Sequence, residues 1–101
     1  MTALDTAKGL LWHRLAFCAA STAELERLAT RAGVSWRTLQ RAKTALGVQH
    51  RRVGGIAGDG HWVWYAPNLA KIPAPPLTRE QREHLRAERD RLTREQLRRA
   101  A

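Results

Sequence analysis

Two short amphipathic helical patterns that follow each other almost without a break constrain this fold more than any other feature of the sequence. The first begins at Ser21 with Ser-Thr-Ala-Glu, the pattern of a capping box, in which the Ser21 hydroxyl and the Glu24 carboxylate each accept a backbone N–H of the other. Gly33 is the residue type that ends a helix in a left-handed conformation, and Ser35 is suited to cap a second helix at 36–46. A turn this short makes the two helices cross steeply, as in a helix-turn-helix.

The segment 5–20 has the same helical spacing and predicts a further, N-terminal helix. Cys18 is the only cysteine, so the chain forms no internal disulfide, and its place on the apolar stripe predicts a buried thiol in a reducing, intracellular compartment. The expected core positions of the three helices are Ala7, Leu10, Leu11, Leu15, Phe17, Cys18, Leu25, Leu28, Ala29, Ala32, Leu39, Ala42 and Leu46.

Residues that favour strands occupy 48–53 and 61–65, and the glycine-rich sequence between them predicts the flexible tip of a β-hairpin. Bulky residues alternate along the second strand, so we expect at least one of Trp62 and Trp64 to close the core. Trp36 opens the preceding helix, and we expect it to pack on the hairpin, because large aromatic side chains usually bury against neighbours.

Three helices followed by a hairpin is the element order of a winged helix-turn-helix. We therefore expect a mainly α fold with a β-hairpin (α+β), a winged helix-turn-helix domain with a two-stranded wing, over residues 1–70. The proline-rich sequence at 71–77 predicts an extended linker. Residues 78–101 predict an arginine-rich C-terminal helix that begins with a capping box between Thr78 and Gln81.

The C-terminal helix carries eight arginines against five acidic residues, a composition typical of a solvent-exposed helix. Its leucines, Leu85, Leu92 and Leu97, are too few for a long coiled coil. This favours a solvated, partly frayed helix over a dimerising zipper. A homodimer through these leucines and an arm lying along nucleic-acid phosphates both stay open.

The chain holds 18 Lys and Arg against 9 Asp and Glu, a formal net charge of +9. This charge indicates a polyanionic partner, and the first such partner to consider is double-stranded DNA. Arg37 and Arg41 lie four apart on the outer face of the helix at 36–46, where a recognition helix meets base edges. Trp36 has a second interpretation, a stacking or thymine-methyl contact with DNA. The expected DNA-binding residues are Ser35, Trp36, Arg37, Thr38, Gln40, Arg41, Lys43 and Thr44, with Arg51 and Arg52 of the hairpin on phosphates or the minor groove.

Catalytic and metal-binding patterns are missing from the sequence. The four histidines have no metal-ligand spacing, and Cys18 has no second thiol to share a zinc ion. We therefore expect no enzymatic activity, no metal and no cofactor. With neither a secretory leader nor an apolar run that could span a membrane, we expect a cytoplasmic protein, associated with the nucleoid when bound to DNA.

The sequence from Ser35 to Trp64, SWRTLQRAKTALGV followed by GGIAGDGHWVW, resembles the winged helix-turn-helix module at the C-terminal end of phage and plasmid replication proteins of the primase and helicase-ATPase kind. The resemblance implies that Arg37, Thr38, Arg41 and Lys43 face DNA. No ATPase or primase sequence precedes the module here, so it implies a free-standing transcriptional regulator or a replication or recombination accessory factor of a phage or other mobile element. The alternative is a protein-interaction module that docks on a replication or transcription enzyme.

Overall fold

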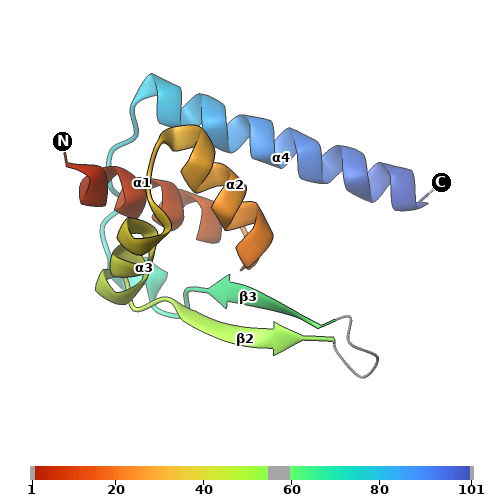
Figure 1. The fold of residues 1–101 in the computed structure, drawn as a ribbon, viewed down its shortest axis with the longest axis horizontal. Helices are drawn as coiled ribbons and strands as arrows, with labels where there is room; N and C mark the ends of the chain where they lie inside the picture. Colours follow the sequence, from red (N-terminus) through yellow and green to blue (C-terminus); the bar gives the residue numbers. More distant parts are fainter. Residues whose placement is uncertain (1, 55–59, 101) are drawn as a thin grey trace.

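A computed structural model describes residues 2–54 and 60–100 of the chain. The elements in chain order are α1 (Ala3–Leu15), β1 (Ala20–Ser21), α2 (Thr22–Ala32), α3 (Trp36–Ala45), β2 (Gln49–Val53), β3 (His61–Tyr65), the 3-10 helix η1 (Leu69–Lys71) and α4 (Arg79–Ala100) (Figure 1). The strands form one antiparallel sheet in the order β1-β3-β2. A mainly helical α+β fold with a β-hairpin is therefore confirmed, with one strand more than expected.

The turn between α2 and α3 forms as its residues predict. Gly33 adopts a left-handed conformation with φ of 71°, and the Ser35 hydroxyl accepts the backbone N–H of Thr38 at 3.2 Å. Leu39 and Ala42 of α3 are buried against the rest of the core. The opposite face of α3 is thereby left toward solvent.

Helix α1 is displaced from its expected range, because it begins at Ala3 and ends at Leu15. A capping box between Thr2 and Asp5 starts it, and the hydrogen bonds from Thr2 hold the pKa of Asp5 below its usual value. The prediction that Phe17 and Cys18 belong to the core is wrong, since Phe17 is 65% exposed and the Cys18 thiol is exposed. The chain leaves the helix so that β1 can pair with β3, and this turns both side chains outward.

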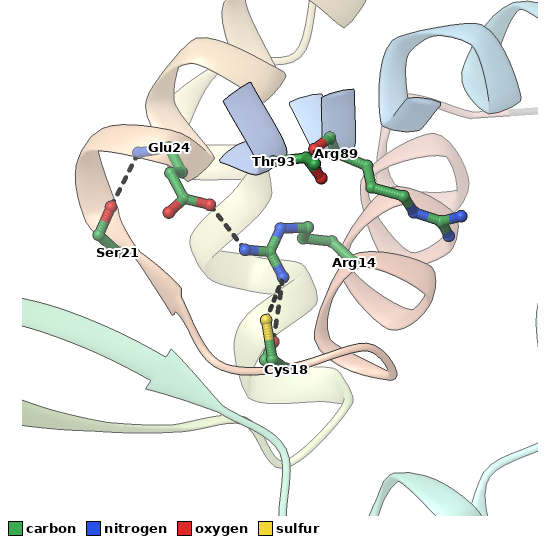
Figure 2. Close-up of polar contacts among 6 residues, drawn as sticks. All are labelled: Arg14, Cys18, Ser21, Glu24, Arg89 and Thr93. Carbon is green, nitrogen blue, oxygen red and sulfur yellow. Dashed lines mark hydrogen bonds and ion pairs between the residues drawn. The ribbon is translucent and has the colours of Figure 1, made fainter. Parts of the chain in front are cut away.

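Arg14 holds the loop that follows α1 (Figure 2). One guanidinium nitrogen lies 2.6 Å from a Glu24 oxygen, and the other donates to the Cys18 carbonyl at 3.1 Å. Burial alone would lower the pKa of Arg14, but the hydrogen bonds to Glu24 and Cys18 outweigh it and raise the pKa. Because the Glu24 carboxylate binds Arg14, the capping box predicted for α2 is only half formed, with the Ser21 hydroxyl accepting the Glu24 N–H at 3.2 Å.

The core lies between the three N-terminal helices and one face of the sheet. Trp64, only 4% exposed, is its aromatic member, whereas Trp62 is 48% exposed, so one tryptophan closes the core as expected. Ala32, expected in the core, is half-buried and packs at its edge. Most of the predicted glycine-rich tip falls at 55–59, outside the described residues.

Lys71, the first residue of the predicted linker, belongs to η1, and 72–77 have no helix or strand, but this segment lies against α1 and does not stand free. The Trp12 indole N–H donates to the Ile72 carbonyl at 3.1 Å, and His13 Nε2 lies 2.7 Å from the Pro75 carbonyl oxygen. The predicted capping box of α4 is confirmed by reciprocal bonds of 3.0 and 3.1 Å between Thr78 and Gln81. These contacts bring α4 back onto the surface of α1 and α2.

One side of the first half of helix α4 packs on the rest of the chain. Glu88 is buried in its first half, and Leu85 packs against the core, whereas Leu97 is 66% exposed. The expectation of a solvated helix is therefore wrong for this side of the first half. A dimer through all three leucines would require Leu85 to leave its own core.

Glu88 provides a stability prediction, because its buried carboxylate has no hydrogen-bond donor among the described residues and its nearest cation, Arg31, is 3.9 Å away. Replacing it by methionine, of similar length, should raise the free energy of unfolding by roughly 1–3 kcal/mol, the usual cost of burying an unsatisfied polar group. Urea denaturation measures this. Glu83→Met, at an exposed site of the same helix, is the control, and an equal or negative effect at position 88 would contradict the prediction.

Candidate nucleic-acid interface

The outer face of α3 is the first part of the interface. Arg37, Gln40, Arg41 and Thr44 are exposed along it. Neither arginine has an ion pair or a side-chain hydrogen bond to another described residue, so both guanidinium groups keep their full set of donors for a ligand. This face therefore offers planar cationic groups one helical turn apart.

The polar residues at the start of α3 are engaged with one another. The Ser35 hydroxyl donates to the Thr38 hydroxyl at 2.9 Å while it caps the helix, so both side chains fix the N-terminus of α3. The Thr44 hydroxyl donates to the Gln40 carbonyl at 3.3 Å. These residues orient the helix, and of the three hydroxyls only that of Thr38 has a hydrogen that is not already donated to another described residue.

The seam between α3 and the hairpin is aromatic and cationic. The Trp36 ring lies 5.2 Å from the Trp64 ring at 38°, which confirms that Trp36 packs on the hairpin. Lys43 Nζ is 5.1 Å above the Trp64 ring and 2.7 Å from His50 Nδ1. Lys43 is thus directed to the hairpin and is not aligned with the outer arginines.

The register of the hairpin separates the two arginines that were expected to act together. Arg52 lies opposite Trp62, on the face that carries Trp64 and contacts α3, whereas Arg51 lies opposite Val63 on the other face. The Arg51 guanidinium is 5.5 Å above the Tyr65 ring. Only Arg52 therefore shares a surface with α3.

Two residues of this surface, His50 and Trp62, were not among the expected site residues. Their rings meet edge to face at 5.3 Å, and they help to form a groove of about 340 Å³ between α3 and the hairpin. The alternation of side chains along the strands could have identified both residues. Trp62 is two positions before Trp64 and therefore points to the same face, and His50 is paired with Trp64 across the hairpin. The residues around this groove are Thr22, Trp36, Gln40, Lys43, His50, Trp62 and Trp64.

No protein-family model matches this sequence, and searches of curated proteins and of solved structures gave no match either. Within 2–54 and 60–100, no three His, Cys, Asp or Glu residues gather where they could hold a metal ion. None of the helices in these ranges is long and apolar enough to cross a membrane.

The charge distribution supports an anionic ligand at this interface. Residues 27–58 contain seven Arg and Lys residues and no Asp or Glu. This interval includes all of α3 and β2, so the exposed arginines of the interface have no acidic neighbour along the chain. An extended surface of one sign of charge raises the local concentration of a polyanion and speeds its association.

Proposed function

We propose that the protein is a sequence-selective double-stranded DNA-binding protein without catalytic activity, built as a winged helix-turn-helix. The observation that carries this proposal is that Arg37 and Arg41 are both exposed on the outer face of α3 and have no partner among the described residues. The order α1-β1-α2-α3-β2-β3 and a sheet in the order β1-β3-β2 support the winged-helix assignment. One helix of this size fits the major groove of B-DNA.

In this proposal α3 enters the major groove with its outer face toward the bases. Arg37 and Arg41 donate to guanine O6 and N7, and Gln40 can pair with adenine N6 and N7. The Thr38 hydroxyl can donate to a phosphate oxygen, whereas the Ser35 and Thr44 hydroxyls would first have to exchange their present acceptors, the Thr38 hydroxyl and the Gln40 carbonyl, for a phosphate. Arg52 extends the same cationic surface along the inner face of the hairpin.

The biological role we propose is a small transcriptional regulator, or a replication or recombination accessory factor of a phage or other mobile element. The resemblance of Ser35 to Trp64 to replication-protein modules supports it. The second candidate, docking on a replication or transcription enzyme, is favoured by the exposed Phe17 and Trp62 rings. Salt separates the two, because phosphate contacts make log K fall with log salt by about 0.9 per contact.

The test of the DNA-reading face is substitution of its arginines. Arg37→Ala and Arg41→Ala should each weaken binding to the preferred duplex by about 1–3 kcal/mol, the usual contribution of a bidentate guanine contact. Fluorescence anisotropy with duplexes selected from a random library measures the affinity. Arg82→Ala, an exposed arginine of α4, is the matched control. Parental affinity in both α3 variants would remove α3 from the interface.

A further inference from the structure

The positive charge of α4 is concentrated in one half of the helix. Residues 79–88 hold three arginines and three glutamates, whereas 89–101 hold five arginines against Asp90 and Glu95. The buried residues Gln81 and Glu88 both belong to the first half. Residues 79–88, which include the buried residues of α4, are therefore formally neutral. Residues 89–101 carry the net positive charge of this part of the chain.

The charged half of α4 borders a groove. The C-terminal half of α4, the end of β2 and the start of β3 extend past α2 in the same direction (Figure 1). Between them, a groove of about 430 Å³ is formed by the start of α2, the first residue of β3 and the second half of α4. Its basic side chains are Arg27, His61, Arg91 and Arg99.

The positive charge of this groove is only partly neutralised within the chain. Glu24 faces it but is paired with Arg14 at 2.6 Å, and Glu95 lies 3.8 Å from Arg91. Arg27 and Arg99 have no ion pair to a described residue. Arg27 Nε and Arg91 Nη1 are buried without an acceptor among the described residues, so a ligand in the groove can reach only the other nitrogens of these two guanidinium groups.

The groove adjoins the candidate interface at one residue. Thr22 borders both this groove and the one between α3 and the hairpin. On β3, His61 lies in the first groove and the adjacent Trp62 in the second. Because adjacent strand residues point to opposite faces, these two side chains lie on opposite sides of β3, and the two grooves meet at Thr22.

We propose that this groove binds phosphates of the same DNA duplex, beyond the part that α3 contacts. The inference rests on the proposed function and extends it, giving α4 the role of a second phosphate-binding element. Arginine suits this role because its planar guanidinium can donate two parallel hydrogen bonds to one phosphate. The position of this groove next to the one at α3, with Thr22 in both, favours a nucleic-acid backbone over an acidic protein segment.

The experiment compares two double variants with the same change in charge. Arg91→Gln with Arg99→Gln removes two groove arginines, and Arg82→Gln with Arg86→Gln removes two exposed arginines from the first half of α4. Binding of a mixed-sequence duplex is measured by anisotropy at several salt concentrations. The groove variant should have a slope of log K against log salt that is shallower by about 1.8, since each lost phosphate contact removes about 0.9. The control variant should keep the parental slope.

The outcomes separate this inference from the proposed function. Circular dichroism and melting temperature first establish that both double variants are folded. If the parent binds DNA and the α3 variants weaken it, but the groove variant has the slope of its control, the second site is wrong and the proposed function stands. If the parent fails to bind duplex DNA at low salt, both are wrong.

Discussion

Arg14→Met should lower the free energy of unfolding by about 3 kcal/mol, because it leaves the Glu24 carboxylate partly buried without its cation. The two groups are 2.6 Å apart, with side chains 8% and 16% exposed, so water cannot readily replace the missing partner. The same substitution removes the donor to the Cys18 carbonyl that fixes the loop after α1 (Figure 2). Urea denaturation, with the slope compared between variants, measures the loss.

The double variant Arg14→Met with Glu24→Met is the control for this prediction. A buried ion pair often gains little net stability over well-packed apolar side chains of similar size, whereas breaking it from one side is costly. We therefore expect the double variant to lie within about 1 kcal/mol of the parent. If both single and double variants lose the same amount, the loss comes from packing and not from an uncompensated carboxylate.

Trp64→Ala should cost about 3–5 kcal/mol, the usual range for removing a buried tryptophan. Trp64 closes the core, supports the Trp36 ring at 5.2 Å and lies under Lys43. Its removal takes away the contact that fixes α3 against the hairpin. The melting temperature and denaturation midpoint should both fall.

Trp62→Ala is the matched comparison, because the same residue type two positions away is 48% exposed. We expect it to change stability by about 1 kcal/mol or less, as substitutions away from the core usually do. Equal losses at positions 62 and 64 would mean that the hairpin does not present one tryptophan to the core and the other to the surface.

Local signals account for the parts of the fold that could be predicted from sequence. The turn between α2 and α3 depends on Gly33 and Ser35, whose conformational and capping preferences act within a few residues. The end of α1 could not be predicted in the same way. Phe17 and Cys18 continue its apolar stripe, but pairing of Ala20 with Trp64, distant in sequence, ends the helix first.

The packing of α4 on α2 could not be predicted from the sequence for a different reason. Glutamate is among the residue types that are rarely buried, so nothing in the sequence marks Glu88 as a contact with α2. The outer face of α3 was predictable, because Arg37 and Arg41 follow from helical period alone. The separation of Arg51 from Arg52 requires the strand register, which only the folded hairpin provides.

The most direct test of DNA binding is a titration of the intact protein against a random duplex library at two salt concentrations, followed by sequencing of the bound fraction. Our account predicts a steep fall of affinity with salt, together with an enriched sequence motif. A salt-independent affinity, or no binding at low salt, would contradict it. Either result would favour the alternative, in which the exposed surface binds a protein partner.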